Sequence, residues 1–410
     1  MSKKIDSKLN YSRSRVSTAQ TPRAVSKDKT GWNKYRRGPR PKTGPNLNVK
    51  IESLGNSGEG VGRHEGKVVF VPFTLPGEEV LVAPSKRKSS FINGKLVEIL
   101  KSSSDRQTPQ CEYFTQCGGC DWQHVPYSMQ TQAKTDALRD ALQRIGKISS
   151  PPIQAIVPCD KPYHYRNRIQ GVIKDKRFHF KQRGSNQLIP IHRCAIAEPD
   201  INYYLQNSLD SAPAGRVEIA INSDGVSCLP TNQYNSTTDG FRQVNTLVSD
   251  ALSEQVRDIA RQSTFAQGID LYCGRGSWTL KLAKDHVNTP FLGVDTSADN
   301  IRLALQQAQA AGMTNVSFQQ AQVENLIKDL PLSESLCIVD PPRAGLDARV
   351  TQALSDNPPK RLIYVSCHPA SLARDLLVLT NNAFELVSVT PLDMFPQTAH
   401  LESVSVLQRI

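Results

Sequence analysis

The stretch Leu-Ile-Tyr-Val-Ser-Cys-His-Pro, residues 362–369, decides how the second half of the chain folds. Its first five residues are mostly apolar and β-favouring, which predicts a buried strand ending at Ser366. Pro369 favours the start of a helix, which is expected over 369–381. Ligands collect at the carboxyl ends of strands in open α/β sheets. Cys367 is therefore placed to act as a nucleophile, and an inert buried thiol is the alternative.

Strand and helix patterns alternate from residue 240 onward, which predicts a parallel, doubly wound α/β sheet. Residues 269–277 run from a strand through a turn with two glycines into a helix, and residues 291–295 form a strand ending in Asp295. A carboxylate about 20 residues past a glycine turn is placed to hold ribose hydroxyls. The third glycine of a dinucleotide fingerprint is missing. The layout therefore favours an S-adenosylmethionine-dependent methyltransferase over the alternative, an NAD enzyme.

The remaining strands of this domain are expected to bring three reactive side chains to one place. Residues 336–345 predict a fourth strand and its exit loop, with Asp340 at the strand end. The strand that ends before Cys367 follows as the fifth, and residues 384–390 and 401–410 predict a closing pair of strands. Asp340, Cys367 and Glu402 can then meet around one ligand.

Residues 45–104 alternate short β-favouring runs with glycines, which predicts a small OB-like barrel, an architecture that often binds oligonucleotides. Strands are expected over 49–52, 67–71, 79–82 and 95–99, with Gly58, Gly60, Gly62, Gly66 and Gly77 between strands. The segments 58–63, 69–72 and 75–78 resemble a TRAM domain, an RNA-binding barrel found on RNA-modifying enzymes. An unrelated small barrel is the alternative.

The chain has nine cysteines, an odd number, and their local clustering favours metal binding or catalysis over disulfides. Cys111, Cys117 and Cys120 are spaced C-x5-C-x2-C around a Gly-Gly pair that lets the backbone fold tightly. Cys194 is the preferred fourth ligand. Four thiolates suit a [4Fe–4S] cluster or a structural zinc. Zinc with His124 as the fourth ligand and free structural thiols are the alternatives.

The formal net charge of +12 is concentrated in residues 1–44, which hold 13 of the 50 Lys/Arg residues and two of the 38 Asp/Glu residues. This segment has too few apolar residues to fold alone and is expected to be a disordered basic tail. A basic arm suits a polyanion such as RNA, and a merely solubilising tail is the alternative. Because no apolar run approaches the roughly 18 residues of a membrane span, we expect a soluble, cytoplasmic protein without a membrane partner.

Between the cysteine cluster and the α/β domain, residues 127–146 predict a helix that ends at Gly146. Residues 153–230 are rich in β-favouring residues, and aromatic and Arg side chains interleave over 163–168. That mixture is typical of a surface that stacks and neutralises single-stranded RNA, although an ordinary solvated strand face gives the same pattern.

Several motifs together resemble the RNA uracil-C5-methyltransferase family. They are Asp-Leu-Tyr-Cys-Gly-Arg-Gly at 270–276, Asp-Pro-Pro-Arg-Ala-Gly at 340–345, Tyr-Val-Ser-Cys at 364–367, Pro-Ala-Ser-Leu-Ala-Arg-Asp at 369–375 and Asp-Met-Phe-Pro-Gln-Thr-Ala-His-Leu-Glu at 393–402. With the TRAM-like barrel and the cysteine cluster, the resemblance covers nearly everything after residue 45. It is strongest to the branch that methylates 23S ribosomal RNA, because the related transfer-RNA enzymes typically lack both the barrel and the cluster.

The resemblance implies specific roles for residues of this chain. It implies that Cys367 is the nucleophile and Glu402 the base. The implied S-adenosylmethionine contacts are Gln243, Tyr272 and Asp295, with Asp340 between the cofactor and the target base. It also implies that the four cysteines ligate a [4Fe–4S] cluster: Cys111, Cys117, Cys120 and Cys194.

The chain departs from the family pattern at four positions. His368 follows the nucleophile where Asn is usual, and Ala399 stands where Gly is usual. Ser277 and Gln322 replace asparagines that commonly contact the cofactor. These changes affect secondary contacts and leave the nucleophile, the base and the cofactor acid in place.

The expected organisation has four parts. A basic tail (1–44) precedes a TRAM barrel (45–104); a β-rich central iron–sulfur and RNA-binding domain (105–124 and 150–235) and a Rossmann-like methyltransferase domain (125–149 and 236–410) follow. The expected reaction is methylation of C5 of a uridine in 23S rRNA through a covalent Cys–C6 adduct. Another RNA such as tRNA and a non-catalytic RNA-binding iron–sulfur protein are the alternatives. We expect a monomer without an obligate protein partner.

Overall fold

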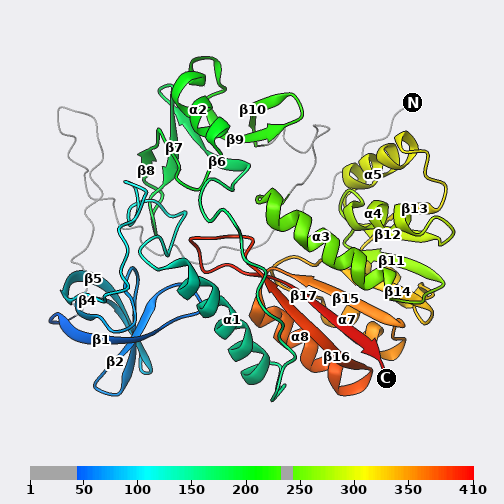
Figure 1. The fold of residues 1–410 in the computed structure, drawn as a ribbon, viewed down its shortest axis with the longest axis horizontal. Coiled ribbons are helices and arrows are strands. Elements are labelled where there is room, and N and C mark those ends of the chain that lie inside the picture. The colour runs from blue at the N-terminus through cyan, green and yellow to red at the C-terminus, as the bar shows by residue number, and fades with distance from the viewer. Residues whose placement is uncertain (1–43, 232–242) are drawn as a thin grey trace, which may run out of the picture. The chain divides into compact units, whose positions relative to one another are not determined.

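The computed structural model describes residues 44–231 and 243–410. Nearly all of the predicted basic tail, and the predicted domain boundary between 235 and 236, lie outside these residues. Three β-sheets, belonging to one compact unit over residues 43–410, organise the described chain (Figure 1). They are a closed barrel, a five-stranded sheet and a seven-stranded sheet, so the predicted fold class is confirmed.

The seven-stranded sheet forms the α/β part of the fold. In spatial order its strands are β13 (Val316–Gln320), β12 (Phe291–Asp295), β11 (Gln267–Leu271), β14 (Ser335–Val339), β15 (Arg361–Ser366), β17 (Glu402–Arg409) and β16 (Phe384–Leu392). The strands from β13 to β15 are parallel, whereas β17 is antiparallel to both β15 and β16. The predicted doubly wound sheet with a closing pair of strands is therefore confirmed.

Helices cover both faces of this sheet, because its central strands are apolar on both sides. In β15, Leu362 and Tyr364 join the core on one face, and Ile363 and Val365 join the core on the other. Helices α1 (Tyr127–Arg144), α7 (Ala348–Asp356) and α8 (Pro369–Asn382) pack on the first face, and α3 (Thr246–Arg261) and α4 (Ser277–Asp285) on the second. Helix α5 (Ala298–Ala310) packs near β12 and β13, and the short α6 (Val323–Leu326) joins the first core.

The five-stranded sheet has the spatial order β10 (Gly225–Pro230), β9 (Gly215–Asn222), β6 (Arg168–Lys174), β7 (Arg177–Lys181) and β8 (Leu188–Pro190). Helix α2 (Pro199–Asn207) packs its buried Ile201 and Leu205 against this sheet. The aromatic and basic segment 163–168, which was expected to form an RNA-binding surface, leads into β6 and is only partly exposed. Tyr165 and Arg168 are buried, with 3% and 8% of their surface accessible. Tertiary packing thus removes Tyr165 from any stacking surface, whereas Arg168, although largely buried, still lines a cavity.

The barrel has the strand order β1 (Leu47–Leu54), β2 (Gly60–His64), β3 (Lys67–Val71), β5 (Phe91–Lys101) and β4 (Glu79–Arg87). The prediction that Gly60 and Gly62 lie between strands was wrong, because both belong to β2. A Cβ atom on Gly62 would collide with the carbonyl oxygen of Lys50, and one on Gly60 would collide with Thr74. The two glycines therefore do not form a turn: Gly62 permits close approach of the β1 backbone, and Gly60 leaves room for the Thr74 side chain.

No helix among the described residues combines the length and the apolar character needed to cross a membrane.

Gly62→Ala is expected to destabilise the barrel, since the added methyl group must push against backbone of β1 that cannot rotate away. Overpacking of this kind lowers the free energy of unfolding by about 1–3 kcal/mol. Calorimetric unfolding measures the change. The control is Arg63→Ala on the same strand, because the Arg63 side chain is 62% exposed. Equal unfolding temperatures for the two variants would contradict the close-packing argument.

Candidate active site

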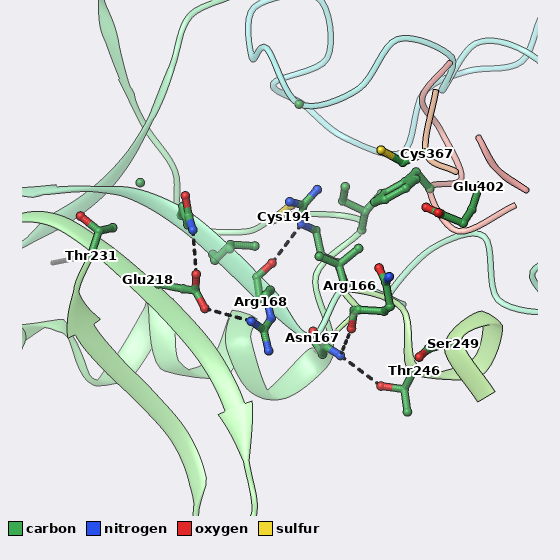
Figure 2. A pocket seen from close by; sticks show the side chains of 18 of the residues that line it. Arg166, Asn167, Arg168, Cys194, Glu218, Thr231, Thr246, Ser249, Cys367 and Glu402 are labelled. Atoms are coloured by element: carbon green, nitrogen blue, oxygen red, sulfur yellow. Dashed lines mark hydrogen bonds and ion pairs between the residues drawn. The ribbon is translucent and has the colours of Figure 1, made fainter. Parts of the chain in front are cut away.

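A cavity of about 1910 Å³ is bordered by the five-stranded sheet, the cysteine segment and the carboxyl edge of the seven-stranded sheet (Figure 2). Eleven of the twelve candidate residues line it: Cys111, Cys117, Cys120, Cys194, Gln243, Tyr272, Ser277, Asp295, Asp340, Cys367 and Glu402. The twelfth, Gln322, does not line the cavity. It precedes α6, where its Oε1 accepts a hydrogen bond from Asn325 at 3.0 Å.

Strand register brings Cys367 and Glu402 together. In the antiparallel β15–β17 pair, Ser366 lies opposite Ser403, so Cys367 and Glu402 are the next residues toward the same edge of the sheet. Figure 2 shows the two side chains close together at the cavity wall. Glu402 is 3% exposed. A thiol and a carboxyl group from strands far apart in sequence therefore face one enclosed space.

Burial shifts the pKa values of both Cys367 and Glu402. Burial, together with the nearby Glu402 and Asp340, raises the pKa of Cys367 to about 11, and Arg343 partly opposes this change. Burial, followed by repulsion from Asp340, raises the pKa of Glu402 well above its usual value. Cys367 is therefore protonated at neutral pH in this state, and burial favours the neutral form of Glu402. Once deprotonated, a carboxylate with a raised pKa is the stronger base.

Asp340 lines the cavity together with Cys367 and Glu402, and it contacts the helix that follows the glycine turn. Burial raises the pKa of Asp340 to about 6, and a hydrogen bond from Trp278 opposes this change. Trp278 Nε1 donates to Asp340 Oδ2 at 3.3 Å. Trp278 was missed in the sequence, although its place in the first turn of the helix after the glycines was a signal.

The glycine turn between β11 and α4 forms the opposite end of the cavity. Tyr272, Gly274 and Gly276 all have positive φ angles, and a Cβ atom on Gly276 would press against the Phe318 ring. The Gly274 amide donates to Asp295 Oδ2 at 3.0 Å, so the turn and the end of β12 are joined directly.

Asp295 is oriented by groups that follow it in the chain. Its Oδ1 accepts hydrogen bonds from the Ser297 amide at 2.9 Å and from Asn300 Nδ2 at 3.2 Å. Asn300 was another missed residue, and Ser297 as the N-cap of α5 was the available signal. Gln243 also lines the cavity, and its carbonyl oxygen accepts a hydrogen bond from Asn167 Nδ2 at 3.0 Å. A carboxylate beside a left-handed glycine turn can bind the ribose of a nucleoside-like cofactor.

The four candidate thiols line the wall nearest the five-stranded sheet. Burial raises the pKa of Cys117, Cys120 and Cys194, and neighbouring thiols of the same group raise it further. The Cys194 backbone is held at both its amide and its carbonyl by the buried side chain of Asn202. Soft thiol donors of this kind suit zinc or an iron–sulfur cluster.

Over residues 44–231 and 243–410, however, the structure contains no group of three or more His, Cys, Asp or Glu side chains arranged to hold a metal ion. His124, the alternative ligand, does not line the cavity. It is buried beside Phe73 and Phe114, and burial lowers its pKa to about 4. The donor types suit a metal centre, but the side chains as described do not form one.

His368 replaces the asparagine usual in this motif and caps α8. Its Nδ1 accepts a hydrogen bond from the Ser371 amide at 3.4 Å, which is a role that an asparagine oxygen also performs. The Ser371 hydroxyl in turn donates to the Arg343 carbonyl oxygen at 3.0 Å. The substitution therefore preserves the helix cap next to Cys367.

Comparison with known proteins gives relatives over nearly the whole chain. The chain is 30% identical to the 23S rRNA (uracil(1939)-C(5))-methyltransferase RlmD of Haemophilus parainfluenzae, with 89% of this chain and 97% of that protein covered. It is 31% identical to an uncharacterized RNA methyltransferase of Bdellovibrio bacteriovorus, with 90% and 96% covered. The crystal structure of the Pyrococcus abyssi tRNA (uracil-54, C5)-methyltransferase with S-adenosyl-L-homocysteine superposes with a TM-score of 0.65. That superposition covers 88% of this chain and 100% of that one at 21% identity, which supports the shared fold.

The barrel, the glycine turn facing a carboxylate and the enclosed thiol define the class of S-adenosylmethionine-dependent RNA methyltransferases. A family model described as tRNA (Uracil-5-)-methyltransferase matches residues 229–410, and a TRAM domain model matches residues 41–97. The chain belongs to the family of RNA uracil-C5 methyltransferases. It is an enzyme that methylates C5 of uracil in RNA with S-adenosylmethionine as the methyl donor.

His368→Ala is expected to lower the free energy of unfolding by about 0.5–2 kcal/mol, since the α8 cap is lost. His368→Asn should retain the cap and stay close to the wild type at pH 8. Denaturant unfolding of the three proteins tests this expectation. Equal stability of the Ala variant and the wild type would contradict the capping role.

As the pH falls, the free energy of unfolding of the wild type should also decrease relative to that of His368→Asn. Burial, followed by the charge of Arg343, lowers the pKa of His368 below its usual 6.5. The unfolded chain then binds the proton more readily than the folded protein does, so stability is retained above about pH 6.5 and lost below it. Denaturant unfolding at pH 8 and pH 5.5 measures the difference. A difference independent of pH would show that this histidine does not titrate as described.

Proposed function

We propose that this chain methylates C5 of a specific uridine in 23S rRNA, with Cys367 as the nucleophile and Glu402 as the base. The observation that carries the proposal is the pairing of these two side chains at one edge of the sheet, in a cavity that also contains Asp340. Relatives named as 23S rRNA enzymes match the chain over more than 94% of their own lengths. Transfer RNA is the second candidate substrate, which the name of the matching family model favours.

The proposed chemistry requires a thiol and a carboxylate around one ring, because C5 of uracil is a poor nucleophile. The Cys367 sulfur, after losing its proton to solvent water, adds to C6, and the ring electrons move to C5 and the C4 oxygen as an enolate. C5 would then bond to the methyl group of S-adenosylmethionine as the sulfonium S–CH3 bond breaks, with S-adenosylhomocysteine as the leaving group. Glu402 removes the C5 proton, the C5–C6 double bond re-forms and the sulfur leaves C6. Splitting the substitution in this way replaces one difficult step by easier ones.

The proposed cofactor contacts occupy the glycine-turn end of the cavity. Asp295 is expected to hold the ribose, while Tyr272 and Ser277 flank the turn and Gln243 contributes from the facing wall. Asp340 would lie between the cofactor and the target base. Gln322 is the weakest member of the set, because its side chain does not line the cavity.

The target uridine must leave its base stack to enter the cavity, which costs a few kcal/mol. In this proposal the RNA-binding surfaces belong to the TRAM barrel (45–104) and the central domain (105–124 and 150–235). The catalytic domain is 125–149 with 236–410. Arg166 supports this division, because this basic residue of the central domain lines the same cavity as the proposed nucleophile (Figure 2). The protein is proposed to act in the cytoplasm as a monomer.

A [4Fe–4S] cluster held by the four cysteines is the second part of the proposal. Their donor chemistry and their common position on one cavity wall support it. Cluster binding would require the thiolate forms, so it would offset the burial that raises the pKa values of Cys117, Cys120 and Cys194. The methyl transfer needs no electron transfer, so the proposed role of the cluster is structural, in the segment that borders the RNA-binding cavity.

Denaturing gel analysis of the protein with unmodified 23S rRNA and S-adenosylmethionine tests the two catalytic roles. Glu402→Gln should accumulate a covalent protein–RNA adduct, because the C5 proton is not removed, and turnover should fall by about 10²–10⁴-fold. Cys367→Ala should form neither adduct nor product. The matched controls are Cys228→Ala, outside the cavity, and Glu385→Gln on the exposed side of β16, and both should behave as the wild type. Methyl transfer by Cys367→Ala at the wild-type rate would contradict the mechanism.

Competition between RNAs tests the proposed substrate. With unmodified 23S rRNA and unmodified tRNA offered together, label from the cofactor should enter the 23S rRNA at one uridine. Label in the tRNA alone would favour the second candidate and overturn the rRNA assignment without affecting the chemistry.

Anaerobically purified wild type is expected to be brown and to contain iron, whereas Cys194→Ser should lose most of its iron. Cys228→Ser is the matched control, since its partly buried thiol contacts Tyr204 and does not line the cavity. Elemental analysis and visible absorption provide the measurement. Colourless protein with stoichiometric zinc would contradict the cluster assignment.

A further inference from the structure

A loop over residues 393–401 connects β16 to β17 and leads directly into Glu402, the first residue of β17 (Figure 1). Phe395 from this loop lines the cavity. In the sheet register, Leu392 lies opposite Glu402, so the loop closes on itself at the proposed base. The path of these nine residues therefore determines how Glu402 enters the cavity.

Four consecutive carbonyl groups of the loop each accept a hydrogen bond from a different part of the protein. The Met394 carbonyl accepts from Asn245 Nδ2 at 3.3 Å and the Pro396 carbonyl from the Tyr165 hydroxyl at 3.0 Å. The Gln397 carbonyl accepts from the amides of Asp121 and Trp122 at 2.8 and 3.0 Å. The Phe395 carbonyl accepts from Lys134 at 2.9 Å. Such complete pairing specifies a single backbone conformation.

Lys134 and Gln130 lie one helical turn apart on the same face of α1, and both are buried. Lys134 Nζ forms an ion pair with Asp393 Oδ1 at 2.5 Å, and neither side chain has any exposed surface. Its ammonium group also lies 5.8 Å from the centre of the Trp122 ring. A buried ammonium group with two oxygen acceptors and an aromatic face holds the start of the loop.

Gln130 holds the end of the loop through a reciprocal pair of hydrogen bonds. Its Nε2 donates to Gln397 Oε1 at 3.0 Å, and its Oε1 accepts from the Gln397 amide at 2.9 Å. Gln397 has a φ angle of 67°, in the left-handed region that a non-glycine residue rarely adopts without support. The amide pair supplies that support.

We propose that Gln130 and Lys134 are positioning residues that fix the 393–401 loop so that Glu402 faces C5 of the target uracil. The inference rests on the proposed role of Glu402 as the base. Neither α1 residue lines the cavity, so both act through the loop rather than on the substrate. Asn245, which holds Met394, is two residues from Gln243 and links the same loop to the proposed cofactor wall.

Loss of this positioning should slow the step that needs Glu402 and spare the steps before it. The thiol addition and the cofactor contacts depend on β15 and on the glycine turn, which α1 does not hold through these bonds. Gln130→Met, which keeps the size of the side chain and removes its hydrogen bonds, should therefore still form the covalent RNA adduct. Release of methylated product should fall roughly 10- to 100-fold, the usual effect of a misplaced catalytic group. The KM for S-adenosylmethionine should be unchanged.

Single-turnover methylation with adduct detection, on the full chain with unmodified 23S rRNA, tests the proposal. Gln132→Met is the matched control, because Gln132 lies on the same helix but is exposed. Its side-chain amide donates a hydrogen bond to Asp136, one turn further along α1. Persistent adduct in Gln130→Met and normal release in Gln132→Met support the proposal. Equal release by both variants, or loss of adduct formation in Gln130→Met, overturns it.

Gln397→Gly keeps the test decisive if Gln130→Met does not fold. Glycine adopts the left-handed angle without strain, while the side-chain amide bond to Gln130 is lost. A smaller but measurable accumulation of adduct is expected, and release at the wild-type rate in this folded variant overturns the proposal. Glu402→Gln in the same assay separates the two hypotheses. Absence of adduct in Glu402→Gln would refute the role of the base, whereas its presence together with normal release in the α1 variants refutes only the positioning role.

Discussion

The antiparallel pairing of β17 with β15 is the constraint on which the active site depends. In an all-parallel sheet, the residue that begins a strand lies at the edge opposite to the residue that ends its neighbour. Reversal of β17 brings the first residue of that strand, Glu402, beside Cys367, which follows the last residue of β15. The sheet edge where parallel strands present ligands thereby gains a carboxyl group from a strand that runs the other way.

Burial then determines what these side chains can do. Asp340 and Glu402 are both removed from water, and Asp340 disfavours the charge of Glu402 while both disfavour the charge of the Cys367 thiolate. Arg343 is the nearby positive charge that opposes this effect on Cys367. In the proposed mechanism, the carboxylate of Glu402 is neutralised by the C5 proton as the sulfur leaves as an anion, so the number of negative charges in the cavity does not change. Local charge balance thus links the two proposed catalytic residues.

Much of the fold followed from local patterns, because the continuous apolar run of β15 and the glycine turn after β11 depend on neighbouring residues alone. The barrel glycines were misassigned because the close approach of Lys50 to Gly62 is a contact between strands, which sequence spacing does not reveal. The candidate cavity residues were found through motifs. Gln322 was not supported, because its side chain turns to Asn325 at the start of α6. A lysine in an amphipathic helix is normally expected on the solvated face. Only the tertiary structure, with the ion pair to Asp393, shows that Lys134 is buried.

The buried pair of Lys134 and Asp393 is better explained by specificity than by stability. Removing two charges from water costs several kcal/mol for each ion, and apolar residues of similar size often serve as well or better for stability. An apolar pair would not direct a donor to the Phe395 carbonyl or require a single loop path, whereas the ammonium group does both. The left-handed backbone of Gln397 also indicates that the loop has one specified conformation. A non-glycine residue keeps such a backbone angle only where surrounding contacts hold it. Helix α1 therefore does more than pack Leu138 and Leu142 into the core, because its polar residues also hold the segment that precedes Glu402.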